Sequence, residues 1–251
     1  MSTASPFSHA CFRFHGELNA FLPVDQRGRV IDYAFKHHPG IKDPIEALGV
    51  PHTEVMALTV NGAGSRFDYQ LRDGDQVEVY PVFEDPNLEV PVALRAELAN
   101  PGFVLDVHLG KLAKILRLLG QDTLYRNDFE DAELVDISEQ QNRVLLTRDR
   151  RLLFHRRIVY GHYLFSTDAM EQARNVIRHY QLAARLKPFT RCVRCNGRLY
   201  DVSKTDIINE LEPKTKRYYQ HFYRCVDCGQ IYWRGSHFRG IMARLAGLGA
   251  I

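Results

Sequence analysis

The feature that most restricts the fold of this chain is a pair of Cys-x-x-Cys motifs in its C-terminal quarter. Cys192 and Cys195 stand in "RCVRCNGRLY", and Cys225 and Cys228 stand in "YRCVDCGQIYW". Each pair precedes a polar or glycine turn and a strand-like stretch, so each forms a knuckle that directs two thiolates to one point. Four thiolates suit the tetrahedral coordination of Zn²⁺, and the 29-residue gap between the pairs leaves room for strands. We expect a zinc ribbon over residues 188–251, with a structural Zn²⁺ on these four cysteines.

Other roles for these cysteines fit the sequence less well. A disulfide needs an oxidising compartment, but "MSTASPFSHACFRF" has neither the basic start nor the apolar core of a secretion signal. No apolar run approaches the roughly 18 residues that span a bilayer, and a redox-active Cys-x-x-Cys would not need a second copy. We therefore expect a cytoplasmic protein in which the fifth cysteine, Cys11, is a small buried apolar residue.

The net charge of +3 hides an uneven distribution. Residues 174–251 contain 15 Lys and Arg against 5 Asp and Glu, whereas the preceding residues contain 18 against 25. A basic segment joined to an acidic one suggests a polyanionic partner, although a solvated arginine-rich surface explains the charge equally well. Aromatic side chains among these cations would suit stacking on unpaired bases, but for Tyr232 and Trp233 a place in the ribbon core is favoured. The residues concerned are Arg191, Arg194, Arg198, Tyr218, Tyr219, Tyr223, Tyr232 and Trp233.

Residues 10–85 have the pattern of a small α+β unit. "ACFRFHG" alternates like a strand, "ELNAFLPV" is expected to pair back on it, and "VIDYAFKHHPG" is expected to form a short helix that ends at Gly40. Two turn signals, Asn61-Gly62 and Asp73-Gly74, then lie beside β-rich runs. This ββαβ…β order is that of a β-grasp, or ubiquitin-like, domain.

The stretch "LRDGDQVEVYPV" makes this segment similar to the small sulfur-carrier proteins of the β-grasp fold. Those carriers act through a free C-terminal Gly-Gly, whereas this segment continues into "EDPNLEVPVALRAELANPG". We therefore expect a docking module for a protein partner rather than a sulfur carrier. The prolines of the continuing stretch predict a linker over residues 86–101.

Residues 102–187 alternate between strand and helix patterns, which predicts an α/β domain with a mainly parallel sheet and helices on its faces. The strands expected are "FVLD", "DTLYR", "RVLLT" and "IVYGHYLF". After the first strand, leucines recur at helical spacing from Leu109 to Leu119, and Gly120 is expected to end that helix. Further helices are expected from Asp131 to Gln140, from Arg150 to Arg156, and from a cap at Ser166-Thr167-Asp168 to about Leu182.

Aspartates stand near the ends of these strands. Asp106 ends "FVLD", Asp149 follows "RVLLT", and Asp131 begins the helix after "DTLYR". The carboxyl ends of parallel strands meet at one edge of a sheet, so we expect the three acids to converge there. Converging carboxylates repel unless a divalent cation lies among them, and hard oxygen ligands suit Mg²⁺ or Mn²⁺. Such a cation activates water and stabilises charge on a phosphodiester, which makes these acids the expected catalytic residues.

Helix capping is the alternative explanation for Asp131 or Asp149 taken singly, because aspartate is common at helix N-termini. Capping would not require three acids at one edge, so the set favours the metal site. Asp168 is a candidate fourth acid, and Asp128 is an alternative to Asp131.

At these residues the chain resembles a known family. "FVLDVHLGKLAKILRLLGQDTLYRND…DAELVDISEQQNRVLLTRDRRLL" looks like the PIN-like RNase domain named after the C-terminal region of the exonuclease Mut-seven. That family shows an Asp before a "LGKLA…LR.LG.DT" helix, an acidic "D.EL" and an "LLTRD" strand end, which match Asp106, Asp131 and Asp149. The likeness extends to about Leu245, and many bacterial members carry an N-terminal ubiquitin-like domain. The resemblance implies a metal-dependent ribonuclease.

Contacts with nucleic acid are expected from three parts of the chain. Lys111, Lys114 and Arg117 form a row on one helix, which is either a phosphate-contacting face or an ordinary exposed helix face. Arg148 beside Asp149 and Arg194 in the ribbon would meet an anionic substrate. His237 lies in "YWRGSHF", which recurs in the resembled family, with a packed surface histidine as the alternative.

The leading hypothesis is a metal-dependent ribonuclease that holds Mg²⁺ or Mn²⁺ at its acids and positions single-stranded RNA with the basic ribbon. The second is a non-catalytic RNA-binding or adaptor protein that uses the β-grasp domain and the ribbon. A third, a toxin-like nuclease controlled through its β-grasp domain, has no direct support in the sequence. None of the three involves a membrane.

Overall fold

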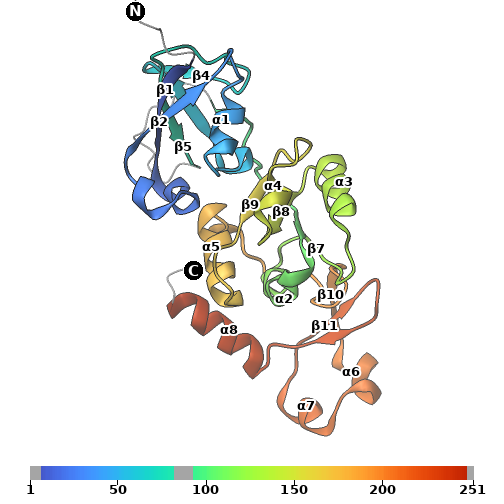
Figure 1. Ribbon diagram of the computed structural model, residues 1–251. Coiled ribbons are helices and arrows are strands. Elements are labelled where there is room, and N and C mark those ends of the chain that lie inside the picture. Colours follow the sequence, from blue (N-terminus) through green and yellow to red (C-terminus); the bar gives the residue numbers. More distant parts are fainter. Residues whose placement is uncertain (1–6, 82–92, 248–251) are drawn as a thin grey trace, which may run out of the picture. The chain divides into compact units, whose positions relative to one another are not determined.

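The computed structural model of the protein describes residues 7–81 and 93–247 (Figure 1). Contacts within the chain group them into two compact units: an N-terminal unit with residues 7–81, 93–99 and 149–163, and a C-terminal unit with residues 100–148 and 164–247. The end of the expected β-grasp segment and the start of the expected linker, residues 82–92, lie outside the described part, as do residues 248–251. Within that part, no helix combines the length and the apolar character that crossing a membrane requires.

The N-terminal unit contains a five-stranded sheet with the order β2-β1-β5-β3-β4. Its central strands β1 and β5 are parallel, and the other neighbouring pairs are antiparallel. This arrangement confirms the β-grasp architecture, and its core includes Phe12, Phe14, Ile45, Leu58 and Val79. The elements are β1 (Ser8–Phe14), η1 (Gly16–Phe21), η2 (Val24–Gln26), β2 (Val30–Phe35), α1 (Lys42–Ala47), η3 (His52–Glu54), β3 (Ala57–Val60), β4 (Ala63–Ser65) and β5 (Gln76–Tyr80).

Two elements expected in this unit are wrong. The strand expected over residues 17–24 is mostly the 3-10 helix η1, and the helix expected over residues 30–40 begins as the strand β2, which pairs with β1. In β2, Ile31 and Phe35 are buried while Val30 and Asp32 are exposed, which is the two-residue period of a strand. The hairpin signal is confirmed, since Asn61 and Gly62 join β3 to β4 with positive φ angles of 51° and 79°.

Residues 149–163 pack within the N-terminal unit. The buried carboxylate of Glu54 accepts a hydrogen bond from the Tyr163 backbone N–H at 2.5 Å and lies 3.0 Å from His162 Nδ1. His52 Nε2 donates to the Ile158 carbonyl at 2.9 Å. Hydrogen bonds to η3 therefore hold this segment within the unit. The segment contains α4 (Arg150–Leu153) and β9 (Gly161–Tyr163).

The C-terminal unit is built on short parallel strands, with β6 between β7 and β8. Every residue of β6 and β8 is buried, as expected for a parallel sheet that is covered by helices. Helix α2 packs against α5, and α3 packs against β6 and β8. The elements are β6 (Phe103–Leu105), η4 (Val107–Leu109), α2 (Gly110–Leu118), β7 (Thr123–Leu124), α3 (Asp131–Gln141), β8 (Val144–Thr147), α5 (Ala169–His179) and η5 (Ala183–Arg185).

Helix α2 ends at Leu118, and Gly120 follows its C-cap Leu119, close to where the sequence predicts the end of the helix. Gly120 has a φ of +86°, and a Cβ at this position would lie 2.1 Å from the carbonyl oxygen of Lys187. The backbone N–H groups of Lys187 and Phe189 donate to the carbonyls of Leu119 and Leu118. Because Gly120 has no side chain, residues 187–189, which lead into the ribbon, can pack against the end of α2.

The cysteine-containing segment forms a small antiparallel sheet with the order β10-β11-β12. Among its described residues, Ile207, Leu211 and Phe222 form a small buried core, with Tyr219 and Trp233 packed against them. Helix α8, which the sequence analysis did not predict, follows the sheet and packs against α5 (Figure 1). The elements are β10 (Leu199–Val202), α6 (Lys204–Ile207), η6 (Ile208–Glu210), α7 (Pro213–Tyr218), β11 (Phe222–Cys225), β12 (Ile231–Tyr232) and α8 (Ser236–Gly247).

Gly120→Ala is expected to destabilise the C-terminal unit by at least about 2 kcal/mol, because the new Cβ meets both a left-handed backbone and a close carbonyl. The control is Gly28→Ala, where φ is +67° and no atom lies within 4 Å of the added Cβ. It is expected to cost about 1 kcal/mol from backbone strain alone. Urea denaturation followed by circular dichroism measures both, and equal losses would argue against the close approach at Gly120.

Candidate functional site

Asp106 lies at the carboxyl end of β6 and is only 7% exposed. Its carboxylate accepts a 2.8 Å hydrogen bond from Thr147 Oγ1, at the end of the neighbouring strand β8. Although Asp106 precedes η4, its side chain caps no helix. A carboxylate has about four acceptor positions, so Asp106 keeps the capacity to bind a further ligand at this edge of the sheet.

A cleft of about 480 Å³ opens where the strands end. It lies between the segments that follow β6, β7 and β8 and the beginning of α5. Lys111, Lys114 and Arg148 give it positive charge, and none of the described residues that line it is acidic. A cleft with one sign of charge concentrates ligands of the opposite sign, so this one suits an anion. The other lining residues are Val107, His108, Gly110, Leu112, Tyr125, Thr167, Ala169 and Gln172.

Asp131 and Asp149 are both exposed, at the beginnings of two helices. Asp131 is the first residue of α3, but Glu130 provides the cap of that helix in a capping box with Glu133. Asp149 caps α4, since its carboxylate accepts from the Arg151 backbone N–H at 2.8 Å, and it belongs to the N-terminal unit. Asp149 therefore acts as a helix cap, as the alternative explanation expects, whereas Asp131 does not.

Asp106 and Asp131, which lie in the same unit, do not belong to a preformed cluster of metal ligands. Among the described residues, no group of three or more ligand atoms within 4.8 Å of one another includes either of them. Ligands of one Mg²⁺ lie about 2.1 Å from the ion and hence no more than about 4.2 Å apart. Asp106 by itself suits Mg²⁺ or Mn²⁺, because such ions often keep several waters and bind through one or two carboxylates.

Arg117 has a structural role, which corrects the expectation that it shares a phosphate-binding face with Lys111 and Lys114. The two lysines are exposed, whereas Arg117 is only 4% exposed. Steps of three residues turn back by about 60° around a helix, so Arg117 points to a different side of α2. Its guanidinium donates to the carbonyls of Thr123, Tyr125, Val193 and Arg194.

Asp122 joins the α/β sheet to the ribbon. Its carboxylate accepts from Arg143 at 3.0 and 3.3 Å, from Arg191 at 3.2 Å and from Asn196 at 2.8 Å. Burial raises the pKa of Asp122, but the hydrogen bonds from Arg143 and Asn196 and the charges of the two arginines outweigh it and leave this pKa below its usual value. The ionised carboxylate thus ties two ribbon residues to the loop before β7.

The four ribbon cysteines meet as the sequence predicts. Their Sγ atoms lie within 4.8 Å of one another, with Cys192 3.6 Å from Cys228 and Cys195 3.5 Å from Cys225. Thiolates about 2.3 Å from a tetrahedral Zn²⁺ are about 3.8 Å apart, whereas the sulfurs of a disulfide are about 2.05 Å apart. The residues after the two pairs, Asn196 and Gly229, turn with φ near 70° and 71°. This four-cysteine cluster could hold a zinc ion.

Hydrogen bonds prepare one of these thiols for a metal. Burial raises the pKa of Cys192, but donors from the Tyr232 hydroxyl and from the backbone of Cys195 and Arg194 outweigh it and lower this pKa to about 7. Burial, together with the neighbouring thiols, raises the pKa of Cys195 to about 12. Four thiols this close do not all ionise without a cation among them, which is the chemistry that Zn²⁺ supplies.

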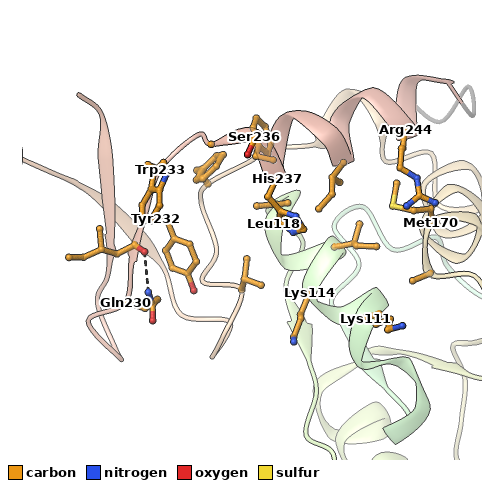
Figure 2. Close-up of a pocket in the computed structure, with 18 of the residues that line it drawn as sticks. Lys111, Lys114, Leu118, Met170, Gln230, Tyr232, Trp233, Ser236, His237 and Arg244 are labelled. Atoms are coloured by element: carbon orange, nitrogen blue, oxygen red, sulfur yellow. Dashed lines mark hydrogen bonds between the residues drawn. The ribbon is translucent and has the colours of Figure 1, made fainter. Parts of the chain in front are cut away.

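Two other cavities adjoin the cleft. A groove of about 1020 Å³ lies between α2, the ribbon and α8, and His237 lines it from α8 (Figure 2). Another cavity, of about 680 Å³, is lined by Arg194 and Arg126. Lys114 lines both of these and the cleft itself. Four of the expected nucleic-acid contacts, Lys111, Lys114, Arg148 and His237, therefore line the cleft or the groove, and Arg194 lines the third cavity.

Sequence reasoning missed two residues at the ends of strands. Tyr125 follows β7, lines the cleft, and donates from its hydroxyl to the Val107 carbonyl at 3.0 Å. Thr147 ends β8 and holds Asp106. The rule that selected Asp106 would have found both if it had been applied to every strand end rather than to acids alone. Thr167 was expected only as part of a helix cap, and Gln172 carries no sequence signal.

Comparison with protein-family models gives two matches along this chain. Residues 101–245, more than half of the chain, match the Mut7-C RNase domain, and residues 7–87 match the Mut7-C ubiquitin domain. Searches of curated proteins and of solved structures found no match. The two family matches agree with the resemblance in the sequence, both in the families and in their order.

Asp122→Asn is expected to destabilise the C-terminal unit by about 2 kcal/mol, since it weakens charge-assisted hydrogen bonds from two arginines. Because the folded pKa of Asp122 is lowered, its contribution is present above the ordinary carboxyl pKa of 3.8 and is lost as the pH falls through the folded value. The difference in unfolding free energy between wild type and variant should therefore be constant above about pH 5 and shrink below it. A difference that grows in acid would contradict this assignment.

Cys195→Ser is expected to lower bound zinc well below about one ion per chain and to loosen the ribbon, because a small domain of this kind folds on its metal. Mass spectrometry of metals in the desalted protein measures the loss. Cys11→Ser is the matched control, since Cys11 lies in β1, outside the four-cysteine cluster. Full zinc content in the Cys195 variant would rule out a four-cysteine site.

Proposed function

Because the chain belongs to the Mut7-C RNase domain family, we propose that it is a metal-dependent ribonuclease that hydrolyses phosphodiester bonds of single-stranded RNA. The chain's own contribution is a place for the phosphate, a carboxylate for the metal and a basic surface for the rest of the strand.

The observation that carries the proposal is the buried carboxylate of Asp106 at the edge of the sheet where the basic cleft opens. Val107, the next residue, lines that cleft together with Lys111 and Arg148. Lysine and arginine bind phosphates regardless of sequence, and open α/β sheets bind their ligands beyond the carboxyl ends of the strands. A phosphate in the cleft would therefore lie beside the one buried acid of this edge among the described residues.

We assign Asp106 to hold Mg²⁺ or Mn²⁺, with Asp131 and Asp149 as the further acids of the family pattern. When bound, such an ion activates water and neutralises charge on the scissile phosphate. Thr147 orients the Asp106 carboxylate through its hydroxyl. Lys111, Lys114 and Arg148 orient the anionic strand.

We assign a structural zinc ion to the four-cysteine cluster. The ribbon core is small, so bound metal would supply folding free energy that this core lacks. Arg117 and Asp122 hold the ribbon against α2 and β7. Zinc would thus act on RNA indirectly, by keeping the ribbon side of the groove in place.

One observation favours a second function, that of a non-catalytic RNA-binding or adaptor protein. Neither Asp106 nor Asp131 belongs to a preformed ligand group, and Asp149 is used as a helix cap. In an adaptor, the basic cleft and the ribbon would bind RNA, and the acids would have only structural roles.

Asp106→Asn is expected to lower Mn²⁺-dependent cleavage of labelled single-stranded RNA by about two to three orders of magnitude, the usual effect of removing one electrostatic stabiliser of a transition state. The control is Asp201→Asn, an exposed acid of β10 that lines none of these cavities. It is expected to cleave as wild type does. The sample without Mn²⁺ is prepared by dialysis, because a strong chelator would also remove the zinc ion from the cysteines.

Two results would decide against the ribonuclease. Cleavage that survives Asp106→Asn would show that the nuclease activity does not depend on this carboxylate. Wild-type protein that binds RNA but does not cut it with Mg²⁺ or Mn²⁺ would favour the adaptor.

A further inference from the structure

The groove of about 1020 Å³ is larger than the cleft at the sheet edge and differs from it in chemistry. Figure 2 shows Lys111 and Lys114 on α2, Tyr232 and Trp233 on the ribbon, and α8 beside them. Neither the family match nor the four-cysteine cluster assigns a role to this groove. Its residues all belong to the C-terminal unit.

Positive charge lines the groove from three elements. Lys111 and Lys114 come from α2, Lys214 from α7 and Arg244 from α8. Among the described lining residues the acid is Asp168, which is already engaged: it caps α5 and lies 3.9 Å from Arg244. The groove therefore presents an excess of cations to any occupant.

Aromatic rings supply flat surfaces between these cations. Trp233 and Tyr219 pack against the ribbon core and against each other, with ring centroids 6.0 Å apart. The Tyr232 hydroxyl contacts Cys192, so the four-cysteine cluster fixes the position of this ring. Tyr218 is different, because it lines the groove while 67% exposed. Its ring is not part of the ribbon core; Arg217 lies over it at 5.5 Å from the ring centroid, and the ring is exposed to a base that stacks on it.

Tyr218 and Lys214 form a matched pair on α7. They are four residues apart, so they lie on the same side of this helix. One offers a ring and the other a cation to the same groove. This combination of a stacking surface with a neighbouring charge is how proteins bind unpaired nucleotides of any sequence.

The groove is continuous with the cleft. Lys111, Lys114, Thr167 and Ala169 line both. A strand whose phosphate lies in the cleft could therefore continue into the groove without leaving the basic surface.

We propose that this groove binds the unpaired nucleotides that flank the phosphate held in the cleft. Their bases stack on Tyr218 and Trp233, and their phosphates contact Lys111, Lys114, Lys214 and Arg244. The substrate is then RNA with a single-stranded extension, accepted largely without regard to its sequence, and a blunt duplex is a poor ligand. This inference rests on the proposed function for the role of the cleft.

The apolar side chains of the groove, among them Leu118, Met170 and Ile241, would also suit a protein segment. The cations favour the polyanion, because a peptide docked on the apolar residues alone would make no use of the three lysines that line the groove. The experiment must therefore also be able to detect a protein segment bound in the groove.

The experiment measures RNA binding by the full, zinc-loaded chain in the Asp106→Asn background, so that cutting does not interfere. Fluorescence anisotropy with a labelled oligouridine compares Tyr218→Ala and Lys214→Ala with Tyr200→Ala and Lys187→Ala. The controls are exposed residues that line neither the groove nor the cleft. A blunt RNA duplex of the same length is the reference ligand.

Tyr218→Ala is expected to weaken oligouridine binding by about 5- to 150-fold, the range for loss of one base stack, with little change for the duplex. Lys214→Ala is expected to reduce the slope of log affinity against log salt by about 0.7, as for one lost phosphate contact on a single strand. Both controls should bind as the background protein does.

Three results would overturn the inference: groove variants that bind as tightly as the controls, equal affinity for duplex and single strand, or self-association by light scattering that Tyr218→Ala abolishes. Failure of the ribonuclease itself looks different. Suppose that RNA binding depends on Tyr218 but the wild type does not cleave RNA. This result would support the groove as a binding site and contradict only the proposed ribonuclease activity.

Discussion

The C-terminal unit depends on the buried guanidinium of Arg117. This group donates to carbonyls of the β7 region and of the first cysteine knuckle. A buried charge must have its donors satisfied, so the knuckle is restricted to the position in which it meets them. That position leaves Lys114 at the junction of the cleft, the groove and the third cavity. Arg117 therefore helps to set the position of the ribbon beside these three cavities.

Much of this unit could be predicted from the sequence because its signals are local. Buried strands such as β8, the end of α2 near Gly120, and the two cysteine pairs each follow from residues close together in the chain. The strand-end rule also located Asp106, whose carboxylate lies at the expected edge. In the N-terminal unit, β2 was mistaken for a helix because a short run such as "VIDYAF" satisfies both periods when its partner strand is unknown.

The errors at the site have a different origin, since they concern what a side chain meets in three dimensions. The spacing of Arg117 from Lys114 suggested a shared exposed face, but the ribbon covers that part of α2. Asp131 and Asp149 share with Asp106 a place near strand ends, yet both are exposed at helix N-termini while Asp106 is buried. Sequence spacing fixes which edge a residue is near, whereas its burial depends on contacts with distant segments.

The hydrogen bonds that hold residues 149–163 in the N-terminal unit mean that neither unit is a continuous piece of sequence. The chain passes from one to the other at residues 99–100, 148–149 and 163–164. During synthesis, Glu54 leaves the ribosome long before its partner Tyr163 is made. The ubiquitin-like domain therefore cannot complete its native contacts until most of the α/β sheet has also been translated. The N-terminal unit thus reaches its full set of contacts only after residues 149–163 have been made, although an N-terminal domain generally folds as a unit first.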